Sequence, residues 1–123
     1  MTFDQYIGMQ RHPDNGFNVA VIDIEEHHKN PTGNINGGVI ISLADNLSTG
    51  VANHHWREKT GEQAFLVGID LHAVMLSNQF GGRITARAEP VRVGRRVTVI
   101  RTLVTGEDNR ILAEITTTHV PVQ

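Results

Sequence analysis

One segment of this chain has the residue spacing of a long helix, and it limits the possible folds more than any other feature. From Gly38 to about Trp56 the apolar residues recur every three to four positions, at Ile40, Leu43, Ala44, Leu47 and Val51. The opposite stripe is polar and short-chained, and consists of Ser42, Asp45, Asn46, Thr49 and Asn53. A solvated helix face more often carries Lys and Glu, so this stripe is predicted to face a cleft or another subunit.

Five other segments are rich in Val, Ile and Thr and are predicted to form strands. They are Phe17–Ile24, Ala64–Leu76, Arg83–Val91, Arg95–Thr105 and Ile111–Val120. Short links with turn residues separate the last four, and such links favour antiparallel neighbours because a parallel crossover needs about a dozen residues. The expected order is strand, helix and a four-stranded meander, an α+β arrangement with one helix on an antiparallel sheet. One helix leaves part of such a sheet uncovered, which favours self-association.

Length and composition exclude several classes of function. A chain of 123 residues fits a single domain, 1–123, and its 11 basic and 13 acidic residues are interspersed, so neither nucleic acid nor a membrane is an expected partner. The absence of cysteine excludes disulfides, thiolate metal sites and a cysteine nucleophile. The first ten residues lack a signal-peptide pattern, and no apolar stretch approaches the ~20 residues of a membrane span. We therefore expect a soluble, cytoplasmic protein.

The loop before the helix, NPTGNINGG at residues 30–38, is rich in Gly and Asn. A helix start exposes unpaired backbone N–H groups that carry partial positive charge, and glycine lets a ligand oxygen come close to them. The N–H of Gly38 is therefore a candidate for stabilising an oxyanion. Glycines that only allow the loop to turn tightly are an equally good interpretation of the local pattern.

Asp45 is the one acidic residue in the polar stripe of the helix. It follows Gly38 by seven residues, or about 10 Å along the helix axis. The Asp45 carboxylate and the Gly38 N–H are thus too far apart to contact the same reacting carbonyl, because each group would have to lie within ~3 Å of it. If both act on one substrate, they come from different subunits. Taken alone, the pattern favours an ordinary hydrogen-bonded helix acid.

The run His28–Gly38, followed after six residues by Asp45, resembles the signature of hotdog-fold acyl-CoA thioesterases of the PaaI and 4-hydroxybenzoyl-CoA thioesterase type. That signature reads H-x-N-x-x-G-x-x-H-G-G, six residues and D. The likeness continues in LADN within the helix, in GIDLHAVML and in VRVGRR, and it covers about residues 17–119.

The resemblance implies a hotdog fold, in which an antiparallel sheet of five or six strands wraps one long central helix. It implies hydrolysis of an acyl-CoA thioester to a free acid and coenzyme A, with no cofactor beyond the coenzyme A of the substrate. Asp45 would be the nucleophile or general base, the Gly38 N–H the oxyanion donor, and Asn30 would position the acid or its water. Gly37 would contact the substrate. In the family these groups meet across a homodimer interface, and two dimers commonly form a homotetramer.

Two positions depart from the family pattern. Asn36 stands where the family usually has a histidine that helps to hold the thioester carbonyl, although an Asn amide can also donate a hydrogen bond. Gly68 stands where many members carry Ser or Thr, so a hydroxyl is missing and room is gained next to the site. Both departures keep open a catalytically impaired protein that binds acyl-CoA without hydrolysing it.

Further substrate contacts are expected from a strand and from a turn. By simple alternation His72 shares its strand face with Gly68 and Asp70, so it would line the pocket or a subunit interface. Guanidinium groups beside a tight turn are suited to the phosphates of coenzyme A, although solvated turn charges are the plain alternative. These groups belong to Arg92, Arg95 and Arg96.

Two other chemistries receive little support. The adjacent pairs His27–His28 and His54–His55 lack accompanying ligands at metal-binding spacing, and adjacent histidines on a helix point about 100° apart, so no metal site is expected. Asp23 and His28 have the Asp-x4-His spacing found in hotdog hydratases and dehydratases. The Asn-Pro residues that such a motif encloses are absent between them, which leaves a hydratase or dehydratase as the weaker alternative enzyme.

Overall fold

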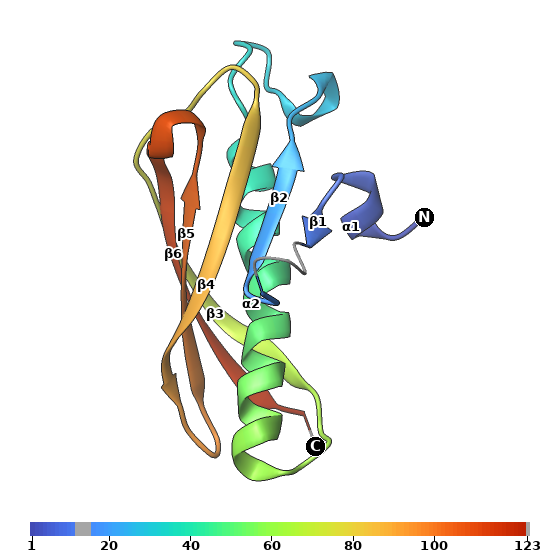
Figure 1. The fold of residues 1–123 in the computed structure, drawn as a ribbon, viewed down its shortest axis with the longest axis vertical. Coiled ribbons are helices and arrows are strands. Elements are labelled where there is room, and N and C mark those ends of the chain that lie inside the picture. Colours follow the sequence, from blue (N-terminus) through green and yellow to red (C-terminus); the bar gives the residue numbers. More distant parts are fainter. Residues whose placement is uncertain (12–15, 123) are drawn as a thin grey trace.

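The computed structural model describes residues 1–11 and 16–122, and it has a curved sheet wrapped around one long helix (Figure 1). In the described residues the sheet has six antiparallel strands in the order β1-β2-β4-β5-β6-β3. Its strands are β1 Gln10–Arg11, β2 Val19–Asp23, β3 Leu66–Met75, β4 Arg83–Val93, β5 Thr98–Thr105 and β6 Ile111–Pro121. The helical elements are α1 Phe3–Tyr6, α2 Gly37–Thr60 and the 3-10 turns η2 Glu26–His28 and η3 Glu107–Asn109. This is the expected α+β architecture of a hotdog fold.

Helix α2 is longer than its sequence pattern predicts. It ends at Thr60 rather than near Trp56, because the first residue able to terminate it is Gly61, whose φ of 72° is left-handed. Arg57 and Lys59 in the last turn stabilise the extension through the helix dipole. The five apolar residues that predict the helix face are all fully buried.

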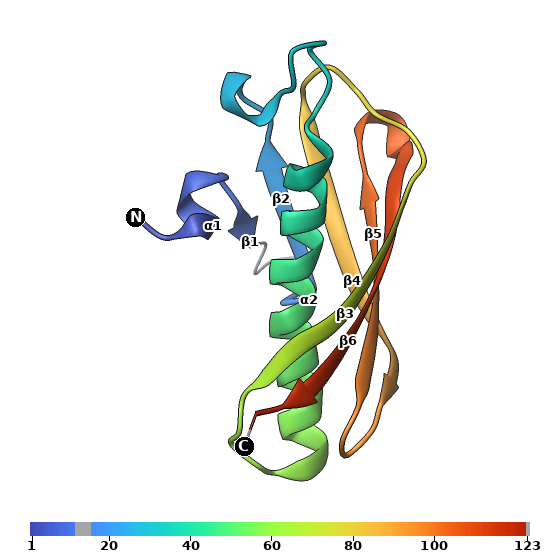
Figure 2. The same cartoon turned by 180° about the vertical axis from the view of Figure 1, so that it is seen from behind.

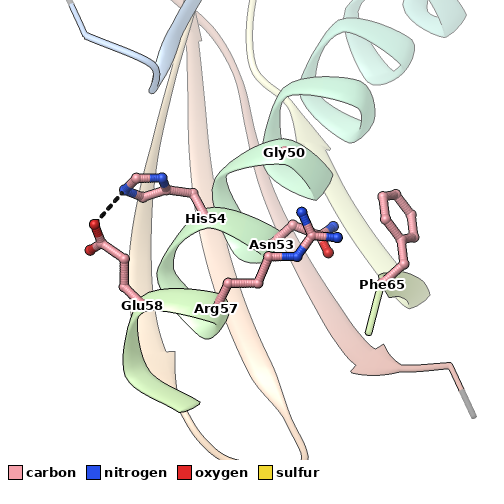
Figure 3. Close-up of a pocket in the computed structure, with 6 residues that line it drawn as sticks. All are labelled: Gly50, Asn53, His54, Arg57, Glu58 and Phe65. Atoms are coloured by element: carbon pink, nitrogen blue, oxygen red, sulfur yellow. Dashed lines mark ion pairs between the residues drawn. The ribbon is translucent and has the colours of Figure 1, made fainter. Parts of the chain in front are cut away.

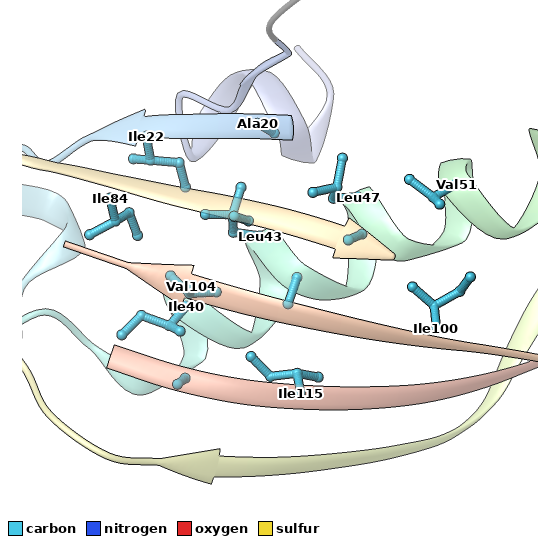
Figure 4. Packing of buried hydrophobic residues seen from close by; sticks show 14 of the residues in the cluster. Ala20, Ile22, Ile40, Leu43, Leu47, Val51, Ile84, Ile100, Val104 and Ile115 are labelled. Atoms are coloured by element: carbon cyan, nitrogen blue, oxygen red, sulfur yellow. The ribbon is translucent and has the colours of Figure 1, made fainter. Parts of the chain in front are cut away.

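The hydrophobic core lies between α2 and the concave face of the sheet. Figure 4 shows Leu43 and Leu47 of the helix among side chains from four strands. Those strand residues include Ile22, Ile84, Ile100, Val104 and Ile115. On β4 buried and exposed residues alternate, since Ile84, Ala86 and Ala88 are buried while Arg83 and Arg87 are exposed.

The predicted four-stranded meander is wrong about β3, the first of its four strands. Strands β4, β5 and β6 follow one another, but β3 pairs with β6 at the far edge of the sheet. The link between β3 and β4, residues 76–82, crosses the end of the sheet instead of making a hairpin (Figure 2). Seven extended residues reach about 23 Å, which exceeds the ~14 Å across three strand spacings. A link of this length is therefore compatible with both topologies.

Asn53 attaches the start of β3 to the helix. Its side chain is buried, its Oδ1 accepts the N–H of Leu66 at 2.7 Å, and its Nδ2 donates to the carbonyls of Leu66 at 3.2 Å and Thr49 at 2.8 Å. One amide thus satisfies both backbone groups of the first β3 residue, which are far from solvent. This contact holds β3 beside the polar stripe of α2.

We expect Asn53→Ala to lower the free energy of unfolding by about 2–3 kcal/mol, because it leaves buried backbone groups of Leu66 without partners. Urea denaturation followed by circular dichroism measures this loss. Asn46→Ala is the matched control. The Asn46 amide donates to the Asp4 carboxylate at 2.6 Å in a partly solvent-exposed position, so its loss should cost less. Equal losses in the two variants would contradict the role given to Asn53.

Candidate active site

Asp45 lies in the helix with its carboxylate facing strand β3. The residue is half-buried and lines a hollow of about 300 Å³ together with Gly68, Ile69, Asp70 and Leu71. Its backbone carbonyl accepts the hydroxyls of Ser48 at 3.0 Å and Thr49 at 2.9 Å. Among the described residues its carboxylate has no recorded hydrogen-bond partner, so both oxygens are available to a ligand or to water.

Gly68 brings strand β3 against Asp45. A Cβ placed on Gly68 would lie 3.8 Å from Asp45 Oδ1, so the two residues border the same space. In the ladder with β6, Gly68 pairs with His119 and Asp70 pairs with Thr118, which leaves Ile69 as an extra residue in a bulge. The structure therefore brings Asp45 and Gly68 together.

The bulge moves His72 away from the site. Paired residues share a sheet face, and Gly68 faces the helix with its buried partner His119, whereas His72 pairs with Thr116 on the outer face. The prediction that His72 shares a face with Gly68 is wrong, because one extra residue at Ile69 reverses the alternation, whereas His72 does share the outer face with Asp70, which pairs with Thr118. On the C-terminal side of the bulge, Leu71 and Ala73 occupy the inner face.

At the helix start the Gly38 N–H already has a partner. Asn36 is the N-cap of α2, and its Oδ1 accepts the Gly38 N–H at 2.8 Å. The preceding N–H, that of Gly37, has no recorded partner within the described part of the chain. Gly37 also borders the inner face of β3, since a Cβ on it would lie 3.5 Å from the Met75 methyl group. Of the two glycines, Gly37 has the N–H that is free for an oxyanion.

Asn30 shapes the loop in front of the helix. Its Oδ1 accepts the N–H of Thr32 at 3.1 Å and the Thr32 hydroxyl at 2.6 Å, which closes an Asx turn. Asn30, Asn36 and Gly37 thus gather at the helix start, while Asp45 is eight residues, or about 12 Å, further along the axis. One chain therefore presents two half-sites that cannot act on the same carbonyl.

The predicted coenzyme A cations lie further from Asp45. Arg92, Arg95 and Arg96 are exposed in and after the end of β4. The Arg95 carbonyl accepts the indole N–H of Trp56 at 2.8 Å, which fixes this turn against the last part of α2. Trp56 is 11 residues after Asp45, or about 16 Å along the helix. The three guanidinium groups thus lie near the C-terminal end of α2, well away from the Asp45 carboxylate.

The Asp-x4-His pair of the hydratase alternative does not form a catalytic dyad. His28 is buried, its Nδ1 accepts the N–H of Glu25 at 2.8 Å, and its Nε2 donates to the carbonyl of Ile7 at 2.7 Å. The Asp23 carboxylate is held by the Arg83 guanidinium at 2.7 and 3.1 Å. His28 therefore serves to attach the N-terminal segment, and a hydratase or dehydratase gains no support from these two side chains.

A second hollow of about 510 Å³ lies further along the helix (Figure 3). Its lining residues are Gly50, Asn53, His54, Arg57, Glu58 and Phe65. His54 and Glu58 form an ion pair at 3.4 Å, and the Arg57 guanidinium stands 5.9 Å over the Phe65 ring. The helical spacing of the first five residues was a signal in the sequence for a shared face. The polar side chains here already have partners, unlike the Asp45 carboxylate.

Within residues 1–11 and 16–122, no group of three or more His, Asp or Glu side chains is arranged to hold a metal ion. No helix in those same ranges is both long and apolar enough to cross a membrane.

His119 on β6 lies beside the candidate site but was not singled out from the sequence. It is fully buried, it pairs with Gly68, and its Nε2 lies 2.8 Å from the Thr117 hydroxyl. Burial lowers the pKa of His119, and the negative charge of Asp45 partly opposes that shift. The alternation of Ile115, Thr117 and His119 along one strand was the signal that would have placed this ring on the inner face.

Comparison with known proteins identifies the superfamily to which the chain belongs. A family model described as the Thioesterase superfamily matches residues 32–113, and the chain belongs to this superfamily. A Bacillus subtilis protein named "Putative esterase ComA2" is 30% identical over 94 residues, which are 76% of this chain and 72% of that protein. A Haemophilus influenzae protein named "Putative esterase" is 29% identical over 92 residues, which are 75% of this chain. The match spans 64% of the length of that relative.

Solved structures share the fold over most of the chain. A thioesterase from Haemophilus influenzae has a TM-score of 0.85 at 22% identity, covering 98% of this chain and 82% of that one. A Bacillus halodurans protein solved with CoA has a TM-score of 0.84 at 18% identity, covering 97% and 74%. The Escherichia coli PaaI protein from the phenylacetic acid degradation operon has a TM-score of 0.75 at 18% identity, covering 85% and 72%. The hotdog fold is thereby confirmed.

The cap at the helix start generates a prediction about stability. We expect Asn36→Ala to lower the free energy of unfolding by about 1 kcal/mol, because the Gly38 N–H loses its acceptor. Asn36→Ser keeps an oxygen that can accept the same N–H, so it should unfold close to the wild type. Guanidinium titrations of the three proteins measure the difference. Equal destabilisation by Ala and Ser would show that Asn36 does not stabilise the protein as a cap.

Proposed function

We propose that the protein hydrolyses an acyl-CoA thioester to a free carboxylic acid and coenzyme A, at a site shared by two copies of the chain. One observation carries this proposal: strand β3 contacts both half-sites, with Gly68 beside Asp45 and Met75 beside Gly37. Membership of the thioesterase superfamily supports thioester hydrolysis as the reaction class. The unpartnered Asp45 carboxylate in its hollow supports a general base or nucleophile at this position.

The exposed edge of the sheet supports dimerisation. Strand β3 is the last strand of the described sheet, and its outer edge pairs with no other strand there. Several of its apolar side chains are more than one third exposed, namely Val67, Ile69, Leu71, Val74 and Met75. A long apolar edge strand favours pairing with another chain, and two identical edges pair most simply about a twofold axis.

Such pairing would complete the site. If two β3 strands pair antiparallel about their centres, the Gly68 end of one strand lies near the Met75 end of the other. Asp45 of one subunit then approaches the partner's Gly37 and its free N–H. This arrangement removes the separation of about 12 Å that divides the two groups within one chain. Asn30 and Asn36 of the same partner would border the site with their amide groups.

The chemistry follows from these two groups. The partner's Gly37 N–H donates to the thioester carbonyl and stabilises the oxyanion that develops there. Asp45 either attacks the carbonyl carbon itself or removes a proton from a water that attacks. In each route the tetrahedral intermediate collapses, the C–S bond breaks and the thiolate of coenzyme A leaves. Attack by water gives the free acid at once, whereas attack by Asp45 gives a mixed anhydride that a water then hydrolyses to the acid and the Asp45 carboxylate. Either route needs an ionised Asp45.

Coenzyme A would bind through its phosphates to the exposed guanidinium groups of Arg92, Arg95 and Arg96. These groups lie at the far end of α2 from the substrate carbonyl, as expected for a nucleotide separated from its thiol by the pantetheine arm. The CoA in the related Bacillus halodurans protein supports a coenzyme A ligand for this fold. Binding energy from the nucleotide would position the thioester for attack.

A second candidate function is binding of acyl-CoA without turnover. It is favoured by Asn36, whose oxygen caps its own helix, and by Gly68, which offers no hydroxyl to the site. The same experiment separates the two candidates.

We expect wild-type protein to release free thiol from at least one member of a panel of short, long and aryl acyl-CoA esters. Asp45→Asn keeps the shape of the side chain but removes the base, so kcat should fall at least ~100-fold while coenzyme A still binds. Glu58→Gln is the matched control because Glu58 is the other acidic residue of α2, and its turnover should match the wild type.

Turnover by Asp45→Asn at the wild-type rate would overturn the assignment of Asp45. Coenzyme A binding by a wild-type protein that releases no thiol from any ester would favour the binding protein instead.

Oligomeric state provides an independent test. Light scattering on a sizing column should give the wild type the mass of two chains, or of four if the dimers pair as the family resemblance implies. We expect Ile69→Lys to reduce that mass towards a single chain, since it places a charge on the β3 edge. Val91→Lys is the matched control, because Val91 on β4 has the same 62% exposure. Dissociation by Val91→Lys, or none by Ile69→Lys, would contradict pairing through β3.

A further inference from the structure

The ring of His119 presents a buried nitrogen without a partner. Its side chain has 0% exposure on the inner face of β6, and its Nε2 lies 2.8 Å from the Thr117 hydroxyl. Its Nδ1 forms no hydrogen bond with any described residue. Leaving a buried polar atom unpaired is costly, and such atoms are rare in folded proteins. Packing alone therefore does not explain why a histidine stands at this position.

The unpaired nitrogen and the Asp45 carboxylate border the same small space. A Cβ placed on Gly68 would lie 3.8 Å from His119 Nδ1 and 3.8 Å from Asp45 Oδ1, and no other recorded atom is closer. Those are ordinary van der Waals distances, so a methyl group on Gly68 would fit between the carboxylate and the edge of the ring without displacing either. Helix α2 supplies an acceptor on one side of this space and strand β6 supplies a ring nitrogen on the other.

We propose that His119 is a positioning residue that, together with Asp45, holds the hydrolytic water at the place where Gly68 has no side chain. The inference rests on the proposed thioesterase function and deepens it, because it selects general-base hydrolysis over direct attack by Asp45. Gly68 thus contributes room, and the hydrogen bond to the water comes from the neighbouring strand.

The donor is Nδ1–H of a neutral imidazole. The Thr117 hydroxyl can donate to Nε2, which places the single ring proton on Nδ1, facing the acceptor-only carboxylate of Asp45. Burial lowers the pKa of His119, and Asp45 raises it by a smaller amount, so the ring stays uncharged at neutral pH.

Each proton has a defined place in the reaction. The water oxygen accepts a hydrogen bond from His119 Nδ1–H with one lone pair and attacks the carbonyl carbon with the other. Asp45 removes one proton from this water as the C–O bond forms. The C–S bond then breaks, and the departing thiolate takes that proton from Asp45. His119 neither gains nor loses a proton, and the balance is thioester plus water to acid plus thiol.

Two amide substitutions separate positioning from a structural role. The amide introduced by His119→Asn lies near the position of the wild-type Nδ1. The amide introduced by His119→Gln lies near the position of Nε2, within reach of Thr117. We expect His119→Gln to lower kcat about 10- to 100-fold with KM nearly unchanged, and His119→Asn to retain most of kcat. His54→Gln, on the exposed face of α2, is the control and should behave as the wild type. A more active Gln than Asn variant would overturn the proposal, because only the bond to Thr117 would then matter.

Substitution of Gly68 tests the water position itself. Gly68→Ala fills the space at ordinary contact distances, so the protein should fold normally while kcat falls as in His119→Gln. Gly68→Ser places a hydroxyl there and should be more active than Gly68→Ala. In the His119→Gln background, Gly68→Ser should restore part of kcat. Full activity of Gly68→Ala would overturn the proposal.

A measurement without substrate keeps this inference separate from the proposed function. The His119 ring is followed by NMR through a pH titration in the wild type, Asp45→Asn and Gly68→Ala, with His119→Asn to assign its signals. Removing the carboxylate should lower the pKa of His119 further, and Gly68→Ala should shift its ring nitrogen signals. An unchanged ring in both variants overturns the pairing. Wild-type turnover with fully active His119→Gln overturns only this inference, whereas absence of wild-type turnover overturns the proposed function.

Discussion

The packing of α2 against the concave sheet fixes the rest of the molecule. The apolar stripe from Ile40 to Val51 is fully buried, and this fixes the rotation of the helix about its own axis. Residue 45 is 100° from residue 44 around the axis, so burial of Ala44 turns Asp45 out of the core and towards β3. The position of the carboxylate is thus a consequence of core packing, and no separate loop is needed to place it.

The helix and the strand alternation could be predicted because both are periodic along the chain. The place of β3 in the sheet could not, because a seven-residue link is long enough for either topology. The bulge at Ile69 had one signal, the glycine at position 68 inside a strand pattern, but a single glycine does not fix where the register shifts. The shift placed His72 on the opposite face from Gly68. The motif around Asp45 predicted a candidate site, but the partner of each N–H at the helix start depended on the rotamer of Asn36. His119 lies 74 residues from Asp45 in sequence, and only the β3–β6 pairing brings it to Gly68.

The departures from the family pattern acquire a physical meaning in this setting. Asn36 stabilises the helix start by capping Gly38, and this leaves Gly37 with the free N–H. Gly68 opens a space between a carboxylate and an imidazole, where a side chain would otherwise stand. Under the proposed mechanism, both changes therefore alter which atom performs a task.

The two features that most disfavour an isolated chain lie next to each other, on β3 and on the neighbouring strand β6. The apolar outer edge of β3 is exposed to solvent, and behind its first residues lies the unpaired Nδ1 of His119. An exposed apolar edge and an unsatisfied buried polar atom each disfavour the isolated chain. Pairing of β3 with a second copy would cover the edge and bring the partner's helix start towards the space beside Gly68. A substrate carbonyl and its water would then lie between Asp45, His119 and the partner's Gly37. The coincidence of both features at β3 argues that the chain is built to complete its site by association.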